Sequence, residues 1–177
     1  MMLVVGAVTL LSLVALSISQ MLVGQTQNVL DSEASFNAIT IAQSLLDEIQ
    51  TKLYEDTTRS VRVFDTQVTT LFADADHVGP TWWKRRAVPL PDSAYPHRSP
   101  NIYTMVNDYN GYVRVDTTTM MQGFRSSVSV YYVSESNPDQ RSEIPTCFKR
   151  IDIVVSHPSM KHSVLVSDIT VYRRFFN

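Results

Sequence analysis

The sequence predicts an α+β fold, in which one long N-terminal helix precedes a mostly antiparallel β-sheet. The first 30 residues carry no Asp, Glu, Lys or Arg, and the first proline is Pro80, so nothing breaks a helix over the opening part of the chain. From Thr57 onward, β-branched and aromatic residues recur with the two-residue period of strands. Because 177 residues suit one domain plus an appendage, we expect a helical segment, 1–55, and a globular β-rich domain, 56–177.

Residues 1–24 are predicted to cross a membrane or to form the core of a filament. About 20 apolar residues span the hydrocarbon of a bilayer as a helix. A cleaved secretory signal is the alternative, but it requires a basic start and a shorter apolar stretch of about 7–15 residues, and this sequence has neither feature. The side chains expected to face lipid or neighbouring helices are Leu3, Val4, Val8, Leu11, Val14, Leu16, Ile18 and Leu22.

Small and polar side chains within this segment are candidates for contact between helices. Small residues allow two helix backbones to approach closely, and hydroxyls bond across the contact. The alternative is that each hydroxyl bonds back to a carbonyl of its own helix. The residues concerned are Gly6, Ala7, Thr9, Ser12, Ala15, Ser17, Ser19, Gln20 and Gly24.

Residues 25–55 are predicted to continue the same helix in amphipathic form, because their apolar residues recur at spacings of three and four. A helix of 55 residues would be roughly 80 Å long at 1.5 Å per residue. That length exceeds what the remaining domain is able to cover, so the N-terminal half must project into lipid or into other subunits. The residues expected to pack on the sheet are Ala38, Ile41, Leu45, Ile49 and Leu53.

The domain is predicted to contain four main strands and a C-terminal one, preceded by a long irregular loop. Residues 74–100 hold five prolines and little periodicity, which is typical of a loop. A short strand is expected before this loop, at Val61–Phe64. The other strands are expected at Ile102–Val106, Tyr112–Asp116, Phe124–Val133, Cys147–Ser156 and Ser163–Phe175.

Two oxygen-rich turns are weak candidates for calcium. One contains Asp74 and Asp76, and the other contains Asp108 and Asn110 within Asn107–Gly111, a sequence typical of a hairpin turn with a positive φ. Calcium requires six to eight oxygen ligands, so ordinary turn chemistry explains both clusters better and no metal site is predicted. The four histidines also lack the spacing of metal ligands.

The composition argues against several classes of function. Lys and Arg total 15 against 17 Asp and Glu, so no excess of positive charge indicates a nucleic-acid partner. Cys147 is the only cysteine, which excludes an internal disulfide and a thiolate zinc site. The sequence contains no Gly-x-Ser-x-Gly elbow, P-loop or dinucleotide fingerprint. We therefore expect neither an enzyme nor a bound cofactor.

The densest aromatic and basic cluster lies inside the proline-rich loop. Aromatic and cationic side chains together favour stacking on a partner or contact with lipid headgroups. The alternative is a loop that packs its tryptophans on its own sheet. The residues of this possible surface contact are Trp82, Trp83, Lys84, Arg85 and Arg86.

Three stretches resemble the type IV pilin and type II secretion pseudopilin superfamily, in particular minor pilin-like proteins of the mannose-sensitive haemagglutinin type. They are 41–56 (IAQSLLDEIQTKLYED), 107–112 (NDYNGY) and 145–158 (PTCFKRIDIVVSHP). The resemblance implies a structural subunit that polymerises through its N-terminal helix, with copies of itself and related subunits as partners. It also implies an inner-membrane location before assembly, and an extracellular filament or the periplasm afterwards.

Family members normally carry a glutamate at the fifth mature position, and this sequence departs from that pattern. The fifth residue is Val5 when counted from Met1 and Leu11 when counted from after Gly6. The missing carboxylate concerns the docking of each new subunit on the N-terminal amine of a neighbour. A second interpretation of the chain is a single-pass, membrane-anchored envelope protein, whose β-rich domain binds a partner without polymerising.

Overall fold

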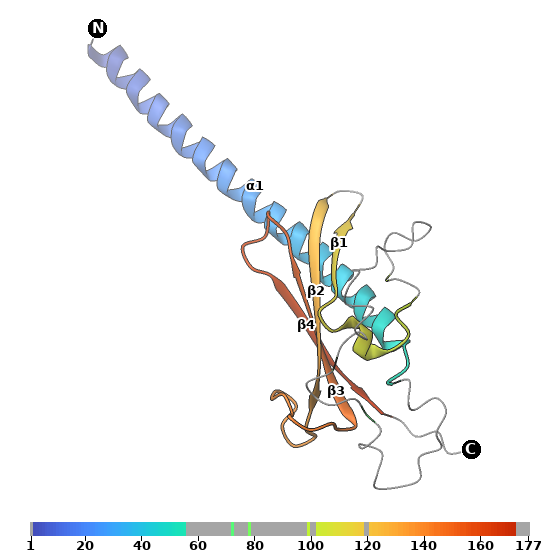
Figure 1. Ribbon diagram of the computed structural model, residues 1–177. Helices are drawn as coiled ribbons and strands as arrows, with labels where there is room; N and C mark the ends of the chain where they lie inside the picture. The colour runs from blue at the N-terminus through green and yellow to red at the C-terminus, as the bar shows by residue number, and fades with distance from the viewer. Residues whose placement is uncertain are drawn as a thin grey trace.

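The protein consists of one long helix, α1 (Met2–Gln50), which lies along a four-stranded antiparallel sheet and extends well beyond it (Figure 1). The computed structural model describes residues 2–55, 72, 78, 99, 102–118 and 121–172, with only the backbone at 2–5 and 7–9. The predicted α+β fold is confirmed. The expected strand Val61–Phe64 and nearly all of the loop 74–100 lie outside the described residues.

Helix α1 has 49 residues and is about 74 Å long at 1.5 Å per residue. It ends at Gln50, five residues before the predicted boundary, because the chain there turns to pair with a distant segment. The amide of Lys52 donates to the carbonyl of Ile49 at 3.0 Å, which tightens the last turn. Leu53 then forms an isolated parallel bridge with Met105. Local helix propensity thus gives way to a long-range backbone contact.

The sheet is a simple meander, in which each strand pairs with the next one along the chain in the order β1-β2-β3-β4. Its strands are β1 (Val113–Thr117), β2 (Gln122–Val133), β3 (Phe148–Ser156) and β4 (Val164–Val171). The predicted strands at Tyr112, Phe124, Cys147 and Ser163 begin within two residues of these. For Ser163–Phe175, the structure describes the chain only as far as Tyr172.

The predicted strand Ile102–Val106 is wrong. Only Met105 makes a bridge there, and the chain continues into a short 3-10 helix, η3 (Val106–Tyr109). Asp108 explains this, because its Oδ2 accepts bonds from the amides of Thr104 at 2.9 Å and Met105 at 3.1 Å. A side chain that satisfies backbone donors locally competes with strand pairing. The expected positive φ is confirmed at Gly111, where φ is +79°.

The core lies between one face of the sheet and the C-terminal half of α1. Residues on β2 and β3 alternate between buried and exposed or part-exposed positions, as expected when one sheet face is covered. On the helix, Ala34, Ala38 and Ala42 are fully buried at a spacing of four. Such small side chains let the sheet approach the helix backbone closely. Larger buried side chains, Leu45 and Ile49, follow towards the helix end.

Candidate functional site

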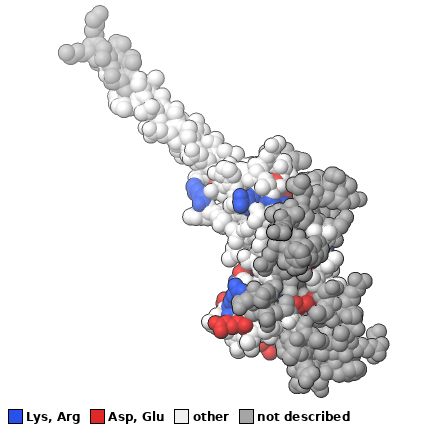
Figure 2. Space-filling model, in the orientation of Figure 1, with Lys and Arg blue, Asp and Glu red and all other residues white. Residues whose placement is uncertain are grey.

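The most prominent functional feature is the N-terminal half of α1, which leaves the domain with its side chains uncovered. Every residue from Leu10 to Leu30 is exposed, and Leu11 is 75% exposed. The projecting rod carries no charge on the face drawn in Figure 2, in agreement with the uncharged sequence up to Leu30. Exposed apolar surface of this extent marks a site of membrane or protein contact.

The predicted contact residues lie on this rod as far as the structure describes it. Five of them, Leu11, Val14, Leu16, Ile18 and Leu22, are exposed large hydrophobic residues that point away from the helix axis on several sides. The side chains of Leu3, Val4 and Val8 lie outside the described part. From Leu10 onward, α1 contains a segment long and apolar enough to cross a membrane.

Two of the serine hydroxyl groups of the rod bond back to their own helix. Ser17 Oγ donates to the carbonyl of Leu13 at 3.0 Å, and Ser19 Oγ donates to that of Ala15 at 2.9 Å. This geometry matches the alternative interpretation of these residues. Because the hydroxyls are already paired, they need no partner helix to be tolerated in an apolar environment.

The domain begins where the first charged residue of the chain appears. The amide of Lys161, in the loop between β3 and β4, donates to Asp31 Oδ1 at 2.8 Å. The Nζ of the same lysine donates to Asn28 Oδ1 at 2.9 Å. These bonds fix the end of the sheet against α1 and divide the helix into an uncovered half and a packed half.

The packed half buries most of the residues expected to contact the sheet. Ala38, Leu45 and Ile49 are fully buried, and Ile41 is partly buried against the core. Leu53 differs: it is 40% exposed and lies beyond the helix end, because its backbone pairs with Met105. On the opposite face, the packed half presents the 71% exposed ring of Phe36 to solvent.

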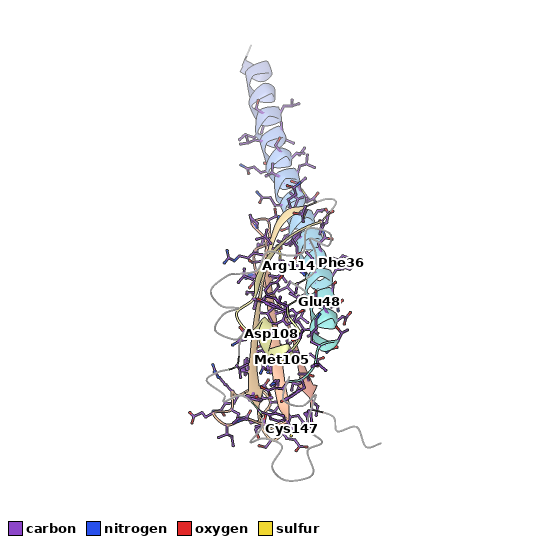
Figure 3. The ribbon with its side chains drawn as sticks, turned by 45° about the vertical axis from the view of Figure 1, so that its right-hand side comes forward. Phe36, Glu48, Met105, Asp108, Arg114 and Cys147 are labelled. Carbon is purple, nitrogen blue, oxygen red and sulfur yellow. The ribbon has the colours of Figure 1, made fainter. Side chains whose placement is uncertain are left out.

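A buried ionic network fixes the packed half to β1. Arg114 Nε lies 2.8 Å from Asp116 Oδ1, and its NH1 lies 3.6 Å from Glu48 Oε2 on α1. Tyr109 donates its hydroxyl hydrogen to Glu48 Oε1 at 2.8 Å. Figure 3 shows Glu48 on the helix and Arg114 on the sheet, at the boundary between the two layers. Burial raises the pKa of Tyr109, and the nearby Glu48 carboxylate raises it further.

A second buried polar cluster lies at the helix exit. Lys149 Nζ lies 3.3 Å from Glu55 Oε2 and donates to the carbonyl of Tyr54 at 3.0 Å. Burial lowers the pKa of Lys149 to about 8, and the Glu55 carboxylate opposes part of that shift. Asn107 and Tyr132 also donate to Glu55. The cluster thus joins the helix exit to η3, β2 and β3.

Sequence reasoning missed this second cluster. The usable signal was the position of Lys149, which falls among the alternate residues of a strand whose other members, Ile151, Ile153 and Val155, are apolar. A lysine on a buried face requires a buried acid. The identity of that acid depends on the fold, because Glu55 is 94 positions away along the chain.

The side chains of the second calcium candidate form hydrogen bonds with the backbone of the protein. Asp108 is engaged as above, and Asn110 donates its amide hydrogen to the carbonyl of Val78 while its Oδ1 accepts from the amide of Val130. Within the described residues, no group of three or more His, Cys, Asp or Glu side chains is placed to hold a metal. Asp74, Asp76 and the possible surface contact, Trp82, Trp83, Lys84, Arg85 and Arg86, lie outside the described residues.

The chain matches no protein-family model, and no curated protein or solved structure is significantly similar to it.

Proposed function

We propose that this chain is a structural subunit of a helical filament of the type IV pilus or pseudopilus kind, which polymerises through the N-terminal half of α1. The single observation that carries the proposal is the uncovered rod at 10–30, which continues without a break into the part of α1 that packs on the folded domain. An apolar surface of this size is unstable in water, so it requires either lipid or other copies of the same helix.

The shape of the molecule supports assembly as well as insertion. Because the packed half of α1 is continuous with the rod, a subunit that inserts its rod among neighbouring rods fixes the position of its domain on the outside. Lipid and neighbouring helices would contact the same apolar side chains. A subunit would therefore move from membrane to filament by exchanging one apolar environment for the other. We place it in the inner membrane before assembly, and in a periplasmic or extracellular filament afterwards.

Electron microscopy of sheared surface material tests this proposal, with antibody against the domain as the label. We expect labelled fibres from cells that make the full chain. A variant that lacks residues 1–24 should give a soluble monomeric domain and no labelled fibre. Fibres formed by the truncated variant would contradict the role of the rod.

A single-pass, membrane-anchored protein with a non-polymerising domain is the second candidate. The observation that favours it is the internal pairing of Ser17 and Ser19, since a rod whose hydroxyls are already bonded suits lipid alone. On this alternative the full chain stays in the membrane fraction as a monomer, and no labelled fibre forms.

A further inference from the structure

Two buried side chains from distant parts of the chain donate hydrogen bonds to one buried carboxylate. Glu55 follows α1, Asn107 lies in η3 and Lys149 lies in β3; they are 4%, 3% and 0% exposed. Lys149 Nζ donates to Glu55 Oε2 at 3.3 Å, and Asn107 Nδ2 donates to Glu55 Oε1 at 3.0 Å. A primary amine and a primary carboxamide are thus bonded to the two oxygens of the same group.

The surroundings of Lys149 are aromatic and dry. Its Nζ lies 3.8 Å from the ring centroid of Tyr54, 4.9 Å from that of Tyr132 and 5.9 Å from that of Phe72. Burial lowers the pKa of this lysine to about 8. At pH 7 about one molecule in ten then carries the neutral, nucleophilic amine, against about one in three thousand for an exposed lysine.

Asn107 uses only one end of its carboxamide. Its Nδ2 is paired with Glu55, whereas its buried Oδ1 has no hydrogen-bond partner among the described residues. Buried polar atoms that serve only structure are normally paired, so this oxygen calls for an explanation. Because no described residue bonds to Oδ1, movement of the amide carbon towards the amine would break no hydrogen bond with this part of the chain at the oxygen.

We propose that Lys149 and Asn107 form an intramolecular isopeptide bond, with Glu55 as the proton carrier. Glu55 takes a proton from the Lys149 ammonium at Oε2, and the freed amine attacks Cγ of Asn107. Glu55 then passes this proton through Oε1 to Nδ2, which leaves as ammonia when the C–N bond breaks. Glu55 also accepts the second proton that the Lys149 nitrogen loses on becoming an amide, and the ammonia carries that proton away as ammonium, which restores the carboxylate. One amide bond forms, one amide bond breaks, and no oxidant, reductant or further reactant is consumed.

The bond would join η3 to β3 beside the helix exit and would close the segment 107–149 into a covalent ring. The proposal does not depend on filament assembly, because every participating group belongs to one folded domain. It gives the domain a covalent cross-link in a chain whose single cysteine excludes an internal disulfide.

Peptide mapping of the full chain, purified in detergent and digested with trypsin, tests the proposal. Trypsin yields 99–114, which contains Asn107, and a linked Lys149 resists cleavage, so 142–150 stays intact. We expect these two peptides as one branched species, with a mass about 17 Da below their sum because ammonia is lost. Two separate linear peptides at full mass would overturn the proposal.

A succinimide at Asn110–Gly111 would lose the same mass, so fragmentation of the peptides is decisive. That product leaves 99–114 linear, and finding it in place of the branch would also overturn the proposal. Lys149→Met and Glu55→Gln should each abolish the branched species, whereas Lys161→Met, at the surface contact with Asn28, should retain it. A branched species in Glu55→Gln would contradict the proton-carrier role.

Discussion

The two halves of α1 belong to one uninterrupted helix but have opposite environments. From Leu10 to Leu30 every side chain is exposed, whereas the following turns bury Ala34, Ala38, Ala42, Leu45 and Ile49 against the sheet. The difference teaches that apolar character alone does not decide which part of the helix the domain covers. In the packed half, Ala34, Ala38 and Ala42 let the sheet approach closely and Leu45 and Ile49 fill the core near the helix end, whereas in the other half even large apolar side chains such as Leu11 stay exposed.

Alkaline pH should produce the largest difference in stability between the rod and the domain that packs on the other half of α1. Burial raises the pKa of Tyr54, Tyr103, Tyr109 and Tyr112 above the ordinary 10.0, so the folded domain keeps phenol protons that the unfolded chain releases. Their contribution to stability is complete below pH 10 and decreases above it, by at most about 1.4 kcal/mol per pH unit for each tyrosine, and only while the pH stays below the raised pKa of that tyrosine in the folded domain.

In detergent, we expect the domain to unfold cooperatively above pH 10 while the rod stays helical. Near-ultraviolet circular dichroism, tyrosinate absorbance and the helical far-ultraviolet signal measure the three events. Tyrosines that titrate near pH 10 without loss of the near-ultraviolet signal would contradict the burial argument.

Removal of the buried arginine should have the next largest effect. Arg114→Met leaves Asp116 and Glu48 without their cation inside the helix–sheet boundary, and breaking a buried ion pair in this way lowers the free energy of unfolding by about 3–5 kcal/mol. Denaturant titration measures the loss. The double variant Arg114→Met/Asp116→Asn should recover part of it, and an Arg114→Met domain as stable as the parent would refute the attachment of the packed half through this network.

A matched pair of leucine truncations compares the halves directly. Leu45→Ala, in the core, should lower the free energy of unfolding of the domain by about 2–5 kcal/mol, because it leaves a cavity. Leu16→Ala, on the rod, should leave domain stability unchanged within about 0.5 kcal/mol. Denaturant titration of both variants in detergent provides the test, and equal losses would show that the rod also packs on its own domain.

The sequence was sufficient to predict the α+β class, the helix and four strands, because these depend on local periodicity and on an absence of proline. It placed the helix end too late, since Gln50 is followed by a bridge between Leu53 and Met105 that only the folded chain brings together. It predicted a strand at Ile102–Val106, where the side chain of Asp108 instead satisfies the backbone. The Glu55–Lys149 pair was not predicted for the same reason, because its two residues are distant in sequence.

Enlargement of a small residue should give the smallest effect. Ala38→Leu adds bulk where the sheet touches the helix, and overpacking of this kind lowers the free energy of unfolding by about 1–3 kcal/mol. The matched control Ala15→Leu lies on the uncovered rod and should not change it. Thermal unfolding of the two variants in the same detergent measures the difference. A neutral Ala38→Leu would mean that the alanine face is not closely packed.

The most direct test of the central claim, that other copies of the chain cover the uncovered half of α1, is cysteine cross-linking in cells. Cys147→Ser supplies a background without cysteine, and Leu11, Leu16 and Leu22 are then replaced by cysteine one at a time. After oxidation with a membrane-permeable reagent, fibre fractions should contain disulfide-linked dimers at each of these positions. The control Ser136→Cys, in the exposed loop after β2, should give fewer. Monomers alone at all three rod positions would contradict the account.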